Sequence, residues 1–170
     1  MEKLIIVRGP CGSGKSTVAK KLLELVEEPT VLIARDQYRF MFSGQWDQRD
    51  PSAEQEMIED NILTGLKHHY DVIVEGIFSM NTHRPMFNRL FRDHPEENHV
   101  FYMDVPFDET LRRHNSRPQK TAFGEKEMKG WWSYASPMGR EGETIIPGSS
   151  TLDGTVKTIG KIASLKLKPA

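Results

Sequence analysis

Short apolar runs alternate with longer amphipathic segments along the chain. Residues 4–7 (LIIV) are apolar at every position, as in a buried strand, whereas the apolar residues of 15–27 recur at helical spacing. The first pattern predicts strands at 4–7, 30–34, 71–78, 100–105 and 144–147. The second predicts helices at 15–27, 36–42, 52–69, 82–93, 107–116 and 151–163.

Two of these predicted helices begin with residues that commonly cap a helix. Ser52, with Gln55 three positions later, has the spacing of a capping box at the start of the third helix. Ser150 or Thr151 can cap the last helix. The alternation of strands and helices predicts an α/β fold of three layers around a mainly parallel, five-stranded sheet. The continuous apolar run DVIVEGIF at 71–78 suits a parallel strand that is covered on both faces.

Composition narrows the class of protein. The length of 170 residues suits a single domain spanning 1–170, and 37% hydrophobic residues are enough for a sizeable core. A net charge of -1 argues against coating nucleic acid by charge alone. The single cysteine excludes an intramolecular disulfide and suits a reducing, cytoplasmic setting. We expect no secretory leader and no membrane span, because apolar runs are short.

The segment GPCGSGKS directly after the first predicted strand matches the phosphate-loop pattern GxxxxGK[ST]. Its glycines allow successive backbone N–H groups to face a phosphate, and the helix that follows adds its positive end. In this pattern the lysine reaches the β- and γ-phosphates of ATP, and the hydroxyl of Ser16 helps to hold Mg²⁺. The predicted ATP contacts in this loop are Gly9, Cys11, Gly12, Ser13, Gly14, Lys15, Ser16 and Thr17.

The rest of the chain distinguishes among the classes of phosphate-loop protein. A guanine-reading NKxD segment does not follow any predicted strand, and no LSGGQ-like signature occurs. Between the fourth and fifth strands lies a charged excursion, about 112–130, where small kinases have a lid. It carries Arg112, Arg113, Arg117 and Lys120. Such cations can stabilise a transferring phosphoryl group, although a solvated basic helix face has the same pattern.

Three segments, GPCGSGKST, RDQYR and DVPFDETLRRHNSRP, resemble the kinase domain of phage-type 5′-polynucleotide kinases. The same core also resembles zeta-toxin-like and antibiotic-phosphorylating P-loop kinases. The resemblance implies that Asp36 deprotonates the acceptor hydroxyl and that Arg39 contacts the acceptor. It further implies that Arg117 assists phosphoryl transfer beside Arg113, and that Glu75 occupies an acidic position of the acceptor site.

Several of these residues have a second interpretation. Asp36 can cap the helix at 36–42 as well as act as a base. Glu75 can serve Mg²⁺, the acceptor or a buried ion pair. Gly148 and Ser149, after the last strand, can contact adenine or form a plain turn. The aromatic residues Trp131, Trp132 and Tyr134 can stack on a base, or one tryptophan can lie in the core and the other at the rim.

The sequence thus predicts a kinase that uses ATP and Mg²⁺ to phosphorylate a hydroxyl group. A nucleic acid 5′ end or a nucleoside is the first acceptor class, and another metabolite or an antibiotic is the second. A regulatory nucleotide-binding protein without an acceptor is the alternative from another class.

Overall fold

The computed structural model describes residues 1–42, 50–116, 123–132 and 134–169. Its centre is a five-stranded sheet in the order β2-β3-β1-β4-β5, in which every pair is parallel. The strands are β1 (Leu4–Arg8), β2 (Thr30–Ala34), β3 (Asp71–Gly76), β4 (Asn98–Asp104) and β5 (Thr144–Pro147). The predicted α/β fold with a parallel sheet is confirmed.

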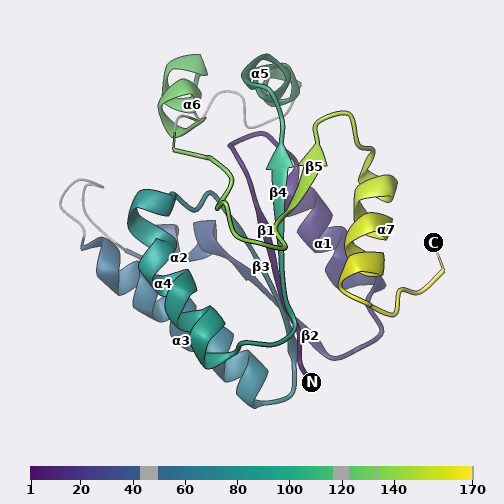
Figure 1. Cartoon of the computed structure of the whole chain (residues 1–170). Helices are drawn as coiled ribbons and strands as arrows, with labels where there is room; N and C mark the ends of the chain where they lie inside the picture. The colour runs from purple at the N-terminus through teal and green to yellow at the C-terminus, as the bar shows by residue number, and fades with distance from the viewer. Residues whose placement is uncertain (43–49, 117–122, 133, 170) are drawn as a thin grey trace.

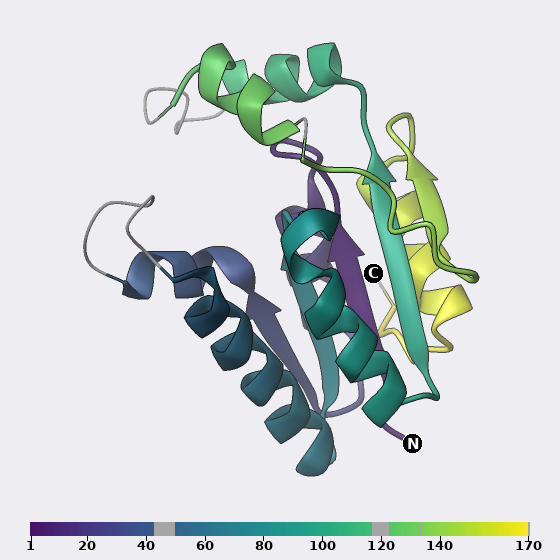
Figure 2. The ribbon, with the colours of Figure 1, turned by 60° about the vertical axis from the view of Figure 1, so that its left-hand side comes forward.

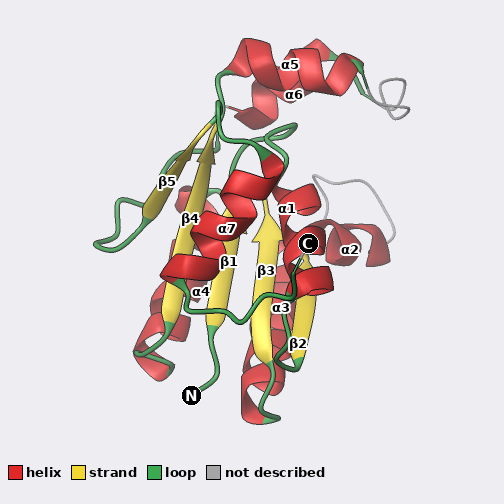
Figure 3. Cartoon of the chain, turned by 90° about the vertical axis from the view of Figure 1, so that its right-hand side faces the viewer, coloured by secondary structure: helices red, strands yellow, loops and turns green. Residues whose placement is uncertain are grey.

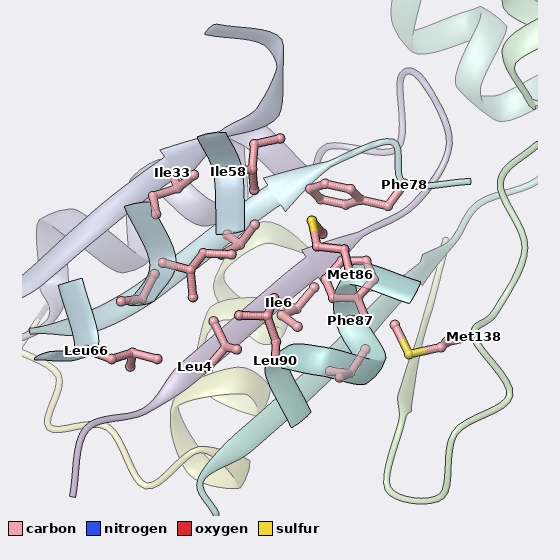
Figure 4. Packing of buried hydrophobic residues seen from close by; sticks show 14 of the residues in the cluster. Leu4, Ile6, Ile33, Ile58, Leu66, Phe78, Met86, Phe87, Leu90 and Met138 are labelled. Atoms are coloured by element: carbon pink, nitrogen blue, oxygen red, sulfur yellow. The ribbon is translucent and has the colours of Figure 1, made fainter. Parts of the chain in front are cut away.

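Helices cover both faces of the sheet (Figures 1 and 3). Side chains of α3 (Pro51–Lys67) and α4 (Met80–Asp93) join one core cluster, shown in Figure 4, where Ile58, Phe87 and Leu90 pack on β1 and β3. The other face is covered by α1 (Lys15–Leu25) and α7 (Leu152–Ile162), whose apolar sides form a second cluster. Since helices lie on both sides, the central strands β1 and β3 are fully buried, which explains their apolar sequences.

Three helices lie near the carboxyl ends of the strands. The short helix α2 (Arg35–Met41) follows β2 directly. Figure 2 shows α5 (Phe107–Asn115) and α6 (Glu125–Trp132) side by side beyond the strand ends, in the place predicted for the lid. Ligands of open α/β sheets bind at this end, so these helices define where a site can form.

At α3 and α4 the helix starts differ from the sequence predictions in ways that have a clear cause. The capping box at Ser52 is wrong, because Asp50 caps α3 by accepting a hydrogen bond from the backbone N–H of Ser52 at 2.8 Å. Pro51 then occupies the first helical turn, where its fixed φ favours a helix start. Helix α4 begins at Met80 rather than at 82, after the cap residue Ser79. At α7 the cap is Thr151, one of the two predicted candidates.

Candidate active site

The phosphate loop lies between β1 and α1 and depends on glycine for its shape. Gly12 has a φ of 78°, and a Cβ there would lie 2.8 Å from the carbonyl oxygen of Thr110. Gly14, with a φ of 96°, immediately precedes the first residue of α1. These left-handed conformations are unfavourable for other residues, so the backbone favours glycine at position 12 as well as at the motif position 14. The loop therefore has the local geometry that the motif predicts.

Ser16 and Glu75 meet at the floor of this loop. The Ser16 hydroxyl donates a hydrogen bond of 2.9 Å to Oε2 of Glu75, which is 4% exposed at the end of β3. Burial raises the pKa of Glu75, while the charge of Lys15 and the Ser16 hydrogen bond lower it. Lys15 is itself buried, with its Nζ 3.4 Å from the carbonyl oxygen of Pro10. Glu75 therefore borders the phosphate loop.

The oxygen atoms of Ser16 and Glu75 fit a magnesium site. Mg²⁺ in nucleotide enzymes is held by one or two protein oxygen ligands together with substrate phosphates and water. A hydroxyl and a carboxylate within hydrogen-bond distance of each other supply such ligands beside the phosphate loop. Among the described residues, no group of three or more His, Cys, Asp or Glu side chains is arranged to hold a metal by itself.

Arg113 of α5 connects the phosphate loop to the turn after β5. Its Nη1 donates to the carbonyl oxygen of Ser13 at 3.0 Å, and its Nη2 donates to that of Gly148 at 2.8 Å. Its Nε pairs with Glu109, whose pKa falls to about 2 because Arg112 and Arg113 both donate to it. The guanidinium thus holds two loops together.

A pocket of about 220 Å³ lies beside these loops and is lined in part by Ser13, Thr17, Arg113, Ser150 and Thr155. Of the turn after β5, it is Ser150 that lines this pocket, while the predicted contact Ser149 is an exposed residue outside the lining.

Helix α2 brings Asp36 and Arg39 to the same end of the sheet. The helix begins after Ala34 without a side-chain cap, so the interpretation of Asp36 as its N-cap is wrong. Asp36 is exposed in the first turn, and its negative charge is close enough to Glu75 to raise the pKa of that carboxyl. The Arg39 guanidinium lies 5.4 Å from the ring centroid of Trp131 in α6. Thus α2 contacts α6, and its first turn lies close to Glu75.

A second pocket, of about 310 Å³, lies between α2, α6 and the first turns of α3 and α4. Arg35 forms part of its wall and is held by the carbonyl oxygen of Ile77 at 2.5 Å and by Glu54 at 2.9 Å. The lining also includes Arg39, His83, Trp131 and Tyr134. We call this the α2 pocket. Arg35, Glu54 and His83 were not among the site residues predicted from the sequence, although Arg35 belongs to the segment RDQYR.

Comparison with known proteins decides the family. Residues 4–132 match the family model described as AAA domain. The chain belongs to this family. No curated protein sequence matches this AAA domain protein. Its fold is shared by the Deinococcus radiodurans tunicamycin resistance protein, at a TM-score of 0.72 and 17% identity, with 99% of this chain and 100% of that chain covered.

Two further structures place the AAA domain protein in the fold of P-loop kinases. The Mycobacterium tuberculosis APS kinase CysC, solved with AMPPNP and APS, matches at a TM-score of 0.71 and 18% identity, covering 96% of this chain and 98% of that chain. A chain of the Pnkp1/Rnl/Hen1 RNA repair complex matches at 0.58 and 22% identity, covering 78% and 43%. The resemblance to P-loop kinases, including polynucleotide kinase, is confirmed at the level of the fold. Within the described residues, no helix of this AAA domain protein is long and apolar enough to span a bilayer.

The segment between α6 and β5 is fixed by a buried ion pair. Nη1 of Arg8, the last residue of β1, lies 3.1 Å from Oε1 of Glu143, and both side chains are almost completely buried. Glu143 also accepts hydrogen bonds from the backbone N–H groups of Met138 and Gly139. The Tyr102 hydroxyl donates to the carbonyl oxygen of Ala135 at 2.9 Å. Met138 itself packs into the core cluster (Figure 4).

The remaining predictions for the segment between β4 and β5 have separate outcomes. Arg117 and Lys120 lie outside the described residues, and helix α5 ends at Asn115. Trp132 donates its Nε1 hydrogen to Val105 and packs on Phe107, whereas Trp131 lines the α2 pocket. Both tryptophans are half-buried, so the expected division into core and rim is wrong.

Proposed function

We propose that this protein is a Mg²⁺- and ATP-dependent kinase that transfers the γ-phosphoryl group to a hydroxyl of a second substrate. The observation that carries the proposal is a pair of pockets at the carboxyl end of the sheet, one beside the phosphate loop and one beside α2. A protein that only senses or hydrolyses a nucleotide needs the first pocket, whereas a kinase must also position an acceptor. The proteins of similar fold described as an APS kinase and a sugar kinase support this interpretation.

On the nucleotide side, the phosphate loop binds the phosphates of ATP through its backbone N–H groups and Lys15. Ser16 and Glu75 hold the metal ion, which neutralises negative charge on the β- and γ-phosphate oxygens when bound. Arg113 keeps the phosphate loop and the turn at Gly148 in register around the nucleotide. Adenine binds along that turn.

Transfer begins when Asp36 takes the proton of the acceptor hydroxyl. The hydroxyl oxygen then forms a bond to the γ-phosphorus, and the bond from that phosphorus to the β–γ bridging oxygen breaks, so that ADP leaves. Asp36 releases its proton to water afterwards. Asp36 is exposed in the first turn of α2 and close enough to affect the charge of Glu75, which leaves it accessible to a substrate.

The α2 pocket binds the acceptor, with Arg39 as a contact on its wall. Arg117 assists transfer from the lid, as the resemblance to polynucleotide kinases implies. Glu75 holds the metal in this proposal, because its carboxylate at the end of β3 is hydrogen-bonded to the Ser16 hydroxyl.

The deciding experiment measures ADP release and transfer of label from γ-labelled ATP with and without acceptors. The acceptor set contains 5′-hydroxyl oligonucleotides, nucleosides, sugars and antibiotics. We expect an acceptor to raise ADP release at least about tenfold and to become labelled, and Lys15→Met to abolish both. ADP release at the same slow rate with every acceptor would instead identify a nucleotide-binding regulatory protein.

A further inference from the structure

The size of the α2 pocket limits what it can bind. Its volume of about 310 Å³ is near the lower end of the roughly 300–1,000 Å³ that is typical of small-molecule sites. Its walls come from the starts of α3 and α4 on one side and from Trp131 and Tyr134 on the other. A molecule of one or two rings fills such a volume, whereas a nucleic acid strand requires a longer groove that follows its backbone.

The charge of the lining points in the same direction. Arg35 is paired with Glu54 at 2.9 Å and also donates to the carbonyl oxygen of Ile77, so its charge is already balanced by the protein. The lining contains two guanidinium groups, Arg35 and Arg39, and one carboxylate, Glu54. Binding to a polynucleotide draws on several cations that neutralise successive phosphates. This lining suits a ligand that is recognised by hydrogen bonds more than by charge.

His83 supplies an unused polar atom. Its side chain lines the pocket, yet the residue is only 4% exposed. Nδ1 lies 3.1 Å from the carbonyl oxygen of Ser79 and 2.8 Å from Oγ1 of Thr82. Nε2 is buried and has no hydrogen-bond partner among the described residues. Buried polar atoms without a partner are rare, since each costs about 1–3 kcal/mol.

A hydroxyl group is the partner that suits Nε2 in either tautomer. If Nδ1 carries the proton and donates to Ser79, Nε2 accepts a hydrogen bond from the ligand. If Thr82 donates to Nδ1, then Nε2 carries the proton and needs an acceptor. A hydroxyl can donate or accept, whereas a phosphate or carboxylate oxygen satisfies only the second case. Burial and the charge of Arg35 lower the pKa of His83 to about 4, so the ring is neutral at neutral pH.

The aromatic wall provides the remaining contact. Trp131 lies under the guanidinium of Arg39, and Tyr134 is 57% exposed beside it. Flat apolar surfaces of this kind pack against the face of a ring while polar groups at its edge reach hydrogen-bond partners. In the α2 pocket, a ring on this wall can direct edge hydroxyls toward His83 and Glu54.

We propose that the acceptor is a ring-shaped small molecule with several hydroxyl groups, one of which hydrogen-bonds to Nε2 of His83 while its face packs on Trp131. This inference rests on the proposed function for the role of the pocket, but it concerns binding and is tested by binding. His83 is the specificity-determining residue in this arrangement, and another hydroxyl of the same ring receives the phosphoryl group.

The test uses saturation-transfer-difference NMR and titration of the full chain without nucleotide. The probes are monosaccharides, cyclitols, nucleosides and aminoglycosides, compared with linear polyols and 5′-hydroxyl hexanucleotides. We expect ring polyols to bind and His83→Phe to weaken them about tenfold or more, because the polar atom is lost while the ring shape stays. His83→Gln, which keeps a polar group near Nε2, should stay within about threefold. His94→Phe, at the opposite end of α4, should match the parent chain, because His94 contacts Glu2 instead of the pocket.

Each other outcome has a defined meaning. Preferred binding of a linear polyol or an oligonucleotide overturns the inference, as does the failure of every ring polyol to bind. So does equal affinity in the His83→Phe and parent chains. If His83→Phe lowers the thermal midpoint enough to prevent binding measurements, Trp131→Ala takes its place, with an expected loss of about fivefold to tenfold. Binding of a ring polyol without phosphoryl transfer contradicts the proposed function alone, and transfer to another acceptor contradicts the acceptor class alone.

Discussion

The hydroxyl of Ser16 donates a 2.9 Å hydrogen bond to the buried carboxylate of Glu75, so the phosphate loop and β3 contribute jointly to one oxygen-rich site. Glu75→Gln keeps the shape and removes the charge. We expect magnesium-dependent nucleotide affinity to fall about tenfold, with a smaller change in the absence of Mg²⁺. Calorimetric titration with ADP, with and without Mg²⁺, measures the difference.

The pH dependence of this binding provides a second test of Glu75. Burial raises its pKa, so in the folded protein the carboxyl ionises at higher pH than an exposed glutamate does. Because the metal requires the ionised form, affinity for magnesium nucleotide should rise as pH increases through this raised pKa. The Gln variant should lose that component. A parallel pH dependence in both proteins would contradict a metal role for Glu75.

Asp36→Asn tests the proposed base. The amide cannot accept the proton, so kcat should fall by about a hundredfold or more, while ATP affinity changes little because Asp36 lies on α2 outside the phosphate loop. Single-turnover transfer from γ-labelled ATP measures the chemical step. The neighbouring exposed residue Gln37 provides a control, since Gln37→Ala should keep kcat within about twofold. A near-normal kcat in the Asn variant would exclude Asp36 as the base.

Arg113→Ala removes both hydrogen bonds that connect the phosphate loop with the turn at Gly148. We expect nucleotide affinity to fall between about tenfold and a hundredfold, because two loops lose a shared charged donor. Arg112→Ala is a matched control, since Arg112 pairs with the same Glu109 but is 72% exposed. Its nucleotide affinity should stay within about twofold. Equal losses of nucleotide affinity in the two variants would show that the effect arises from the lost contact with Glu109.

Arg8→Met tests the buried ion pair between the end of β1 and the residue before β5. It leaves the Glu143 carboxylate without its cationic partner, so the free energy of unfolding should fall by about 3–5 kcal/mol. Breaking the surface pair of Lys21 and Glu24 by Lys21→Ala should cost less than about 1 kcal/mol. Urea unfolding compares the two. A loss below about 1 kcal/mol in Arg8→Met would show that the backbone N–H donors of Glu143 suffice.

We expect His83 to contribute to the unfolding of the protein at acid pH. Its pKa is lowered from 6.5 to about 4, chiefly by burial and then by the charge of Arg35. As pH falls from 6.5 toward 4, the unfolded chain binds a proton that the folded ring does not, so stability is lost over this window. The full shift corresponds to about 3 kcal/mol. This stabilising contribution is fully present above pH 6.5. As pH falls toward 4 the parent chain should lose it, whereas His83→Gln has no such loss, and unfolding measurements at several pH values compare the two.

The parts of the fold that depend on residues close together along the chain could be predicted from the sequence. The apolar run at 4–7 and the glycines after it define β1 and the phosphate loop, since strand periodicity and positive φ are local properties. The helix cap at Asp50 shows the limit of such reasoning. Ser52 has an equally suitable side chain, and the constraint imposed by Pro51 decides between neighbouring candidates.

The site beyond the phosphate loop required the folded chain. Arg8 and Glu143 are 135 positions apart, and Arg35 and Glu54 are 19 apart. Neither pair has a periodicity or a motif that connects its members. Arg8 and Glu143 meet because β1 and β5 both lie beside β4 in the sheet, and Arg35 and Glu54 meet because α2 contacts α3. Packing buries the ion pairs of Arg8 and Arg35, and it leaves Nε2 of His83 without a hydrogen-bond partner in the part of the chain that the structure describes. The sequence does not reveal this, because desolvation depends on every element packed around a side chain.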